Sequence, residues 1–299
     1  MVQMLALYGL FAHRMISGRV RACRPMLARM SDLARAGDST LHILKLVNDC
    51  AYGLYSGRFA LSMEKSAALR TLYDPQLHGG VFLQVGADPL VSVLTAEMHV
   101  HGQRGNEIEM RAALAQACAH VETIGAMLQR SWADIFGAAA LFFCGHGDEA
   151  EALVADGIAR ADAQGAAFWQ LSGRLWQGSF AAFGDRDPAA GRALLEATLP
   201  QAEAAGAHLV LPLFQSALAR SHLAEGAPRA ALAASRRAVS RLIRSGEGTW
   251  APLVLRVHEE ALRRTGHPDR RRRARQLADA YQARSGATIW DSVCRRVLT

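Results

Sequence analysis

The sequence predicts an all-α fold, a right-handed α-solenoid of about seven tetratricopeptide-like helix hairpins with a period near 40 residues. One series of glycines closes long Ala- and Leu-rich segments at intervals of 40 or 41 residues, at Gly125, Gly165, Gly206, Gly246 and Gly286. A second series lies between them at intervals of 39 to 42, with one of 48, at Gly18, Gly57, Gly105, Gly145, Gly184, Gly226 and Gly266. Glycine readily adopts the left-handed conformation that ends a helix. Two interleaved series at one period therefore indicate two helices per repeat.

Apolar residues recur at helical spacing between these glycines. Within 148–163, Leu153 and Ile158 share one stripe, while Glu149 and Asp156 lie off it. The same pattern predicts four pairs of helices: Trp132–Phe143 with Glu149–Ala163, Phe168–Phe183 with Ala189–Ala204, Val210–Ala224 with Arg229–Ile243, and Trp250–Arg264 with Arg270–Arg284. The first helix of each pair is richer in bulky apolar residues, so we expect it to be the more enclosed one.

A single helical-repeat domain spans residues 1–299 in this interpretation. An irregular insertion at about 73–89 interrupts it and accounts for the interval of 48, because it contains the breaker pairs Asp74-Pro75, Gly79-Gly80 and Asp88-Pro89. An Arg-rich C-terminal cap begins at about residue 268. Small residues at Gly137–Ala140 predict a close crossing of two helices.

Composition points to a soluble cytoplasmic protein. Hydrophobic residues make up 51% of the chain, and the five cysteines are scattered without a C-x-x-C pair, which suits a reducing compartment. The N-terminal apolar run has no preceding Lys or Arg, so we expect no signal peptide. The run from Ile135 to Cys144 is about half the length of a membrane span, and we expect no transmembrane helix.

Positive charge gathers at the C-terminal end of the sequence. From Arg220 onward there are 17 arginines and no lysine against 7 acidic residues. A possible electrostatic patch comprises Arg236, Arg237, Arg270, Arg271, Arg272 and Arg273. Nucleic-acid binding would follow if these side chains converged on one face. Four consecutive arginines on a helix spread over most of its circumference, however, which favours a solvated end cap.

Several segments of the first third carry a family resemblance: Leu7–Phe11, Ser17–Arg19, Leu33–Asp38, Ser56–Phe59, Leu72–His78 and Gly86–Pro89. Over roughly residues 4 to 250 the chain resembles the tetratricopeptide-like C-terminal region of bacterial class III adenylate/guanylate cyclase homologues and related predicted-ATPase regulators. The resemblance implies a sensing and docking arm that follows a cyclase domain and a signal-transduction ATPase.

The catalytic parts of that family are not expected in this sequence. A G-x-x-x-x-G-K-[ST] phosphate loop does not occur, and the two lysines, Lys45 and Lys65, follow no glycine-rich turn. The sequence therefore predicts no catalytic residue, no bound cofactor and no metal site. A detached sensor arm and a fragment of a longer protein both remain open, and the longer protein could be an ATPase or a cyclase.

Four residues of the insertion are candidate interaction residues: Tyr73, Asp74, His78 and Asp88. Loops carry function often, but an ordered Asp-Pro turn that bridges two hairpins explains the same residues, and we favour that structural interpretation. His99 and His101 are disfavoured as metal ligands, because residues two apart on a helix point to opposite sides.

An aromatic stripe comprises Phe168, Trp169, Trp176, Phe180 and Phe183. Its helical spacing predicts core packing. Any exposed member of the stripe would be the best candidate for a contact with a partner.

The function predicted from the sequence is a non-catalytic interaction or sensor module. Its concave face would bind a protein or a peptide. An ATPase or cyclase domain in trans and a small molecule are further possible partners. We expect no membrane association. The alternative is a nucleic-acid-associated regulator that uses the Arg-rich C-terminal repeats.

Overall fold

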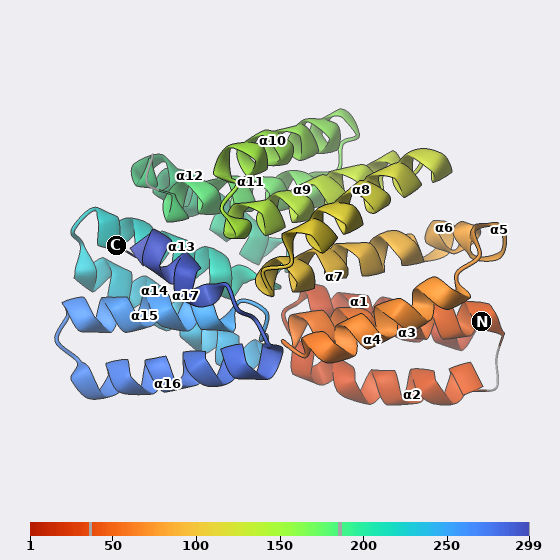
Figure 1. Cartoon of the computed structure of the whole chain (residues 1–299), viewed down its shortest axis with the longest axis horizontal. Coiled ribbons are helices and arrows are strands. Elements are labelled where there is room, and N and C mark those ends of the chain that lie inside the picture. Colours follow the sequence, from red (N-terminus) through yellow and green to blue (C-terminus); the bar gives the residue numbers. More distant parts are fainter. Residues whose placement is uncertain (36–37, 185–186, 299) are drawn as a thin grey trace.

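The computed structural model describes residues 1–35, 38–184 and 187–298, and within these ranges it contains helices and no strand. Each long helix packs on the next one in sequence (Figure 1). This consecutive packing is the arrangement of an α-solenoid, as the sequence predicts. Residues 36 and 37, within the Leu33–Asp38 segment of the family resemblance, lie outside the described residues.

The long helices form pairs of neighbours joined by short connections. Their bounds are α1 Val2–Ile16 with α2 Arg24–Arg35, α3 Ser39–Tyr55 with α4 Phe59–Leu72, α7 Pro89–Gln103 with α8 Glu107–Ile124, α9 Met127–Cys144 with α10 Gly147–Ala163, α11 Ala167–Phe183 with α12 Pro188–Ala204, α13 Leu211–Ala224 with α14 Pro228–Ser245, and α15 Ala251–Arg264 with α16 Pro268–Ser285. The final helix, α17 (Trp290–Leu298), packs on α15.

Short helices fill two connections. A 3₁₀ turn, η1 (Val20–Cys23), lies between α1 and α2. The predicted insertion contains α5 (Pro75–His78), η2 (Gly79–Val81) and α6 (Phe82–Val85), and it ends where Asp88 caps α7.

The first helix of a pair is more enclosed than the second, as expected. Most of α9 is buried, including Ala138 and Ala139 at the predicted close crossing. By contrast, α10 buries one narrow stripe, namely Ala150, Val154, Gly157 and Ala161. A Cβ atom on Gly137 would lie 2.6 Å from Leu114 Cδ1, so a larger residue there would displace this side chain of α8.

The glycines of the two predicted series end helices in the left-handed conformation with one exception. Gly184 ends α11 with φ −76° and ψ 168°, an extended conformation that any residue adopts. At this position the prediction of a left-handed helix stop is wrong. The backbone N–H of Gly184 still bonds to Phe180 O at 2.7 Å, so the helix ends there without needing a left-handed residue.

Inner helices from distant parts of the chain meet end to end. Three carbonyl groups at the ends of α1, α3 and α7 accept backbone N–H groups from the loops that begin α13, α15 and α17: Ile16 O from His208 at 2.8 Å, Tyr55 O from Gly248 at 2.8 Å, and Gln103 O from Thr288 at 2.8 Å. Each contact joins the carbonyl end of one helix to the amide end of another, which aligns the two helix dipoles favourably.

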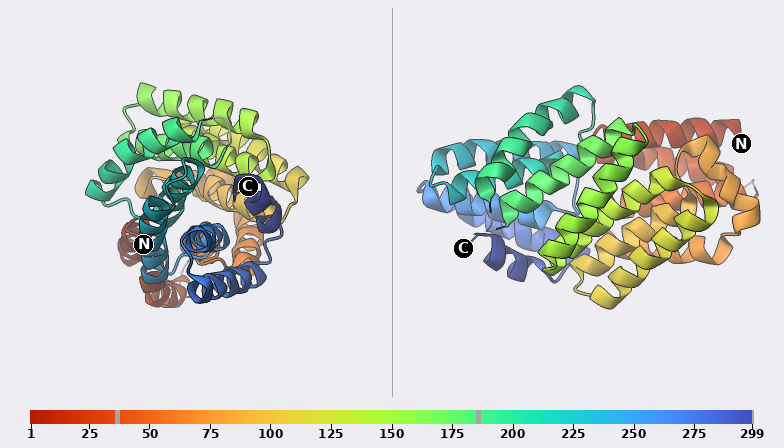
Figure 2. Two further views of the ribbon diagram at one scale, coloured as in Figure 1. Left: turned by 90° about the vertical axis from the view of Figure 1, so that its left-hand side faces the viewer. Right: turned by 90° about the horizontal axis from the view of Figure 1, so that it is seen from above.

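These three junctions close the solenoid on itself. Figure 2 shows a ring of helices in which the blue helix α15, seen end-on, occupies the middle. The indole of Trp250, at the start of α15, lies among the rings of Phe143, Trp176 and Trp290, with centroids 5.1, 5.5 and 5.9 Å away. The chain's own helices therefore fill much of the concave surface that the sequence predicts for a partner.

Among the described residues, no single helix is long and apolar enough to cross a membrane. Residues Pro75–Val85 and Pro89–Gln103 meet the length and composition criteria only together, as a pair bent by 83°.

Candidate functional site

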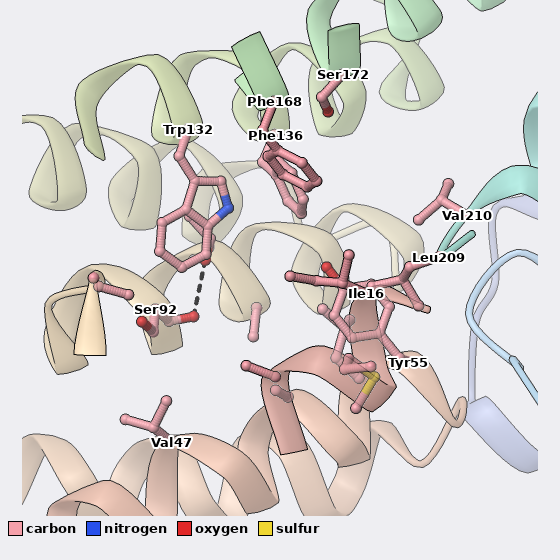
Figure 3. A pocket seen from close by; sticks show the side chains of 18 of the residues that line it. Ile16, Val47, Tyr55, Ser92, Trp132, Phe136, Phe168, Ser172, Leu209 and Val210 are labelled. Atoms are coloured by element: carbon pink, nitrogen blue, oxygen red, sulfur yellow. Dashed lines mark hydrogen bonds between the residues drawn. The ribbon is translucent and has the colours of Figure 1, made fainter. Parts of the chain in front are cut away.

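An apolar cavity lies on the inner face of the ring, with a volume of about 300 Å³. Its walls come from the inner helices α1, α3, α7, α9 and α11, from the end of the insertion and from the start of α13 (Figure 3). None of the described residues that line it carries a charged side chain. The cavity is thus a mainly apolar surface built by six helices that are far apart in sequence.

Aromatic rings form the wall contributed by α9 and α11. The rings of Trp132 and Trp169 stack with centroids 5.7 Å apart and an angle of 18° between their planes. Phe136 lies edge-on to both indoles. Phe168 is 44% exposed, although Trp176 from the same helix is buried. The predicted core stripe is therefore right for Trp176, Phe180 and Phe183, whereas Phe168 is the exposed member.

Three polar side chains of the lining are bonded to nearby backbone, whereas the buried indole N–H of Trp132 has no partner. Ser92 Oγ donates to Asp88 O at 2.7 Å, and Thr95 Oγ1 donates to Ser92 O at 2.8 Å. Asn48 Nδ2 donates to Leu44 O at 3.1 Å. The lining therefore offers an occupant chiefly apolar contact, with the indole N–H of Trp132 as a free donor.

The part of the cavity wall at the start of α13 has a strained backbone and a small side chain, both at Val210. Val210 has φ 67°, and it is the one non-glycine among the described residues with a positive φ. A left-handed conformation is unfavourable for a β-branched residue. Counted from the glycine that precedes each loop, Val210 occupies the same position as Trp250 and Trp290. A valine therefore borders the cavity at the position where the next two loops place an indole.

A buried carboxyl group holds Val210 in place. The backbone N–H of Val210 donates to Glu247 Oε2 at 2.9 Å. Burial raises the pKa of Glu247 to about 7, against the opposing effect of the bonds from Val210 and Ser245. Burial and the nearby Glu247 raise the pKa of Tyr55, which also lines the cavity. The neutral forms of both side chains are therefore favoured beneath this wall.

The structure brings the four candidate residues of the insertion close to one another. The hydroxyl of Tyr73 donates to Asp88 Oδ2 at 2.9 Å, and His120 Nε2 lies 3.2 Å from Asp88 Oδ1. His78 Nδ1 accepts the backbone N–H of Asp74 at 2.9 Å, and its ring centroid is 6.0 Å from that of Tyr73. Their polar atoms are engaged with one another, as in the structural interpretation.

The same residues fasten the insertion to its neighbours. His78 Nε2 bonds to Ser39 Oγ on α3 at 2.9 Å, and Gln129 Oε1 on α9 accepts the N–H of Asp88 at 2.7 Å. Asp74 and Asp88 cap α5 and α7 with their carboxylates. The fastened segment places Val85, Gly86 and Ala87 against the cavity.

The predicted arginine patch divides over more than one face. Arg236 and Arg270 both lie near His258, whose pKa falls to about 4 because of burial and these two charges. Arg271 lies 3.4 Å from Glu259 on α15. Arg237, Arg272 and Arg273 are exposed on α14 and α16.

His99 is a core residue. It is buried between Phe136 and Trp250, with ring centroids 5.1 and 5.3 Å away, and burial lowers its pKa to about 3. The described residues contain no group of His, Cys, Asp and Glu side chains that could hold a metal ion. The five cysteines are unpaired.

Sequence reasoning did not single out the cavity residues Tyr55, Trp132, Phe136 and Val210, nor the carboxyl group of Glu247. One signal was present, because Val210 breaks the aromatic pattern of Trp250 and Trp290 at equivalent positions.

Comparison of the chain with protein-family models and with curated proteins gives no match.

Proposed function

We propose that this protein is a non-catalytic sensor module whose axial cavity binds an uncharged, largely apolar small molecule. In this proposal the fold is a right-handed solenoid of about seven tetratricopeptide-like hairpins with a period near 40 residues. The observation that carries the proposal is the cavity lining, which combines stacked aromatic rings with an absence of charge among the described residues.

The lining favours a neutral occupant. A charged group moved from water into an apolar site without a counter-ion loses several kcal/mol of hydration. An aromatic or alicyclic compound would instead gain contact with Trp132, Phe136 and Trp169. A cavity of about 300 Å³ lies at the lower end of the sizes that hold small molecules.

An extended peptide fits the cavity less well. Each peptide unit brings an N–H and a C=O group that need partners when buried. Ser92, Thr95 and Asn48 already use their donors within the protein. A small molecule is therefore the better occupant of this site, and a protein partner is better sought on the outer surface.

The family resemblance suggests how such binding would be used. A sensing arm that takes up a ligand would pass its state to an ATPase or cyclase domain, supplied in trans or by a longer chain. The unpaired cysteines suit a cytoplasmic location.

A matched pair of fluorescent probes tests the proposal. N-phenyl-1-naphthylamine is neutral, and 1-anilinonaphthalene-8-sulfonate has the same ring system with a sulfonate added. We expect the neutral probe to bind with one site per chain, and the sulfonate to displace it at least about tenfold less effectively. Equal displacement by the sulfonate, or no saturable binding of the neutral probe, would refute the proposal.

A further inference from the structure

A second concave feature, here called the arginine groove, lies between α15, α16 and α17, and none of these helices lines the apolar cavity. Its volume is about 620 Å³. Six arginines line it: Arg256, Arg263, Arg264, Arg271, Arg275 and Arg295. Three acidic residues accompany them, Glu259, Glu260 and Asp291, so positive charge is in excess among the described residues.

The carboxylates of the groove are shared between several guanidinium groups. Glu259, only 6% exposed, accepts bonds from Arg256 at 3.2 Å and from Arg275 at 2.8 Å, and Arg271 is 3.4 Å away. Glu260 accepts from Arg263 and from Arg264, each at 2.7 Å. Since one guanidinium carries about five N–H donors, the bonds to Glu259 leave donors of Arg271 and Arg275 available to an incoming anion.

The guanidinium groups are positioned in advance. Glu259 is buried and fixed on α15, so it holds Arg271 and Arg275 from α16 in place. The side chain of Arg275 remains 53% exposed and that of Arg271 39% exposed. Planar guanidinium groups held in this way bind carboxylates through paired N–H bonds, and little side-chain freedom is lost when they do so.

The shape of the groove favours a peptide over a nucleic acid. No aromatic residue occurs in its described lining, so it lacks a platform on which bases could stack. The neighbouring Arg270 lies near His258 and Arg236 and does not extend the groove into a longer track. Leu298 and Cys294 add apolar contact at the side of α17.

We propose that the arginine groove docks a short acidic peptide segment of a partner protein. This site is separate from the apolar cavity, and its occupation does not depend on the ligand proposed there. The cavity would receive the signal, and the groove would hold the partner.

The experiment measures the fluorescence anisotropy of a labelled oligoglutamate peptide of about eight residues, from about 0.05 to about 0.3 M salt. In the groove variant Arg263→Ala/Arg275→Ala we expect binding to weaken at least about tenfold. The control variant Arg236→Ala/Arg237→Ala removes the same charge from α14 and should weaken binding less than about twofold. The single variant Arg263→Ala removes one exposed side chain that pairs with Glu260 on the same helix. We expect a smaller loss of peptide affinity in this variant and unaltered folding.

Three results would overturn the proposal. The peptide could fail to bind the full chain. The control variant could lose as much affinity as the groove variant, which would indicate general attraction to a basic protein. A single-stranded or duplex oligonucleotide of equal charge could bind more tightly than the peptide and lose affinity in the groove variant, which would assign the groove to nucleic acid.

Discussion

The backbone N–H of Val210 donates a 2.9 Å hydrogen bond to the buried carboxyl group of Glu247, and this bond links the loops that begin α13 and α15. Val210 also borders the apolar cavity and stands in the left-handed conformation. We therefore expect the protonation of Glu247 to affect the position of Val210 in the cavity wall.

Glu247 should make stability fall as pH rises. Its pKa is about 7 in the folded chain against 4.5 for the ordinary group, so the folded state binds the proton more tightly. This contribution is complete below about pH 4.5 and is lost as the pH rises through about 7, a change of about 3 kcal/mol at most. Urea unfolding at about pH 5 and about pH 8 measures it.

The variant Glu247→Gln keeps an acceptor for Val210 and removes the ionisation. We expect the loss of stability between these two pH values to shrink, whereas the exposed control Glu122→Gln should keep it. An unchanged pH dependence in Glu247→Gln would contradict the role assigned to the buried carboxyl group.

The end-to-end junction between α3 and α15 should be sensitive to a single methyl group. A Cβ atom on Gly57 would lie 2.9 Å from the carbonyl carbon of Gly248, whereas one on Gly266 would meet nothing within 4 Å. Both glycines have a positive φ, so Ala costs about 1–2 kcal/mol at either. Gly57→Ala should lose about 1–3 kcal/mol more than Gly266→Ala in chemical unfolding. Equal losses would mean that the ring is open at this junction in solution.

The polar network of the insertion should contribute to stability. Tyr73→Phe removes the donor to the buried Asp88, and we expect a loss of about 1–2 kcal/mol. Tyr281→Phe is a suitable control, because that ring packs under the guanidinium of Arg284 and keeps its contact. If Tyr73→Phe has the same free energy of unfolding as the wild type, the hydroxyl is not structural, and the interaction role that the sequence left as the alternative gains support.

The crossing between α9 and its neighbours should not accept a large side chain. Ala139 is fully buried, so Ala139→Trp overpacks the crossing and should destabilise the chain by about 1–3 kcal/mol. Ala119→Trp places the same ring on the exposed side of α8 and should change the melting temperature little. Similar melting of the two variants would show that the interface lies elsewhere.

Much of the fold can be predicted from local sequence signals. The glycine series and the apolar stripes predict four helix pairs whose ends fall close to those observed, as in Phe168–Phe183 against Ala167–Phe183, except that α9 begins at Met127 and not at Trp132. These signals succeed because a helix and its stop are encoded by neighbouring residues. The missed features depend on residues far apart in sequence, such as the contact of Ile16 with His208. No periodicity within one helix reveals such closure.

The candidate sites likewise divide into one that depends on residues close in sequence and one that depends on residues far apart. Tyr73 and Asp88 are close in sequence, and their contact follows from one short insertion. The cavity needs six helices and the junctions to bring Tyr55, Trp132 and Val210 together, so it could not be predicted from local patterns.

The most direct test of the account is the affinity of the variant Val210→Trp for the neutral probe N-phenyl-1-naphthylamine. An indole at this position would match Trp250 and Trp290 and fill the cavity that Val210 borders. We expect the affinity to fall at least about tenfold while the free energy of unfolding stays the same or rises. Wild-type affinity in a folded Val210→Trp protein would contradict the claim that the axial cavity is the ligand site.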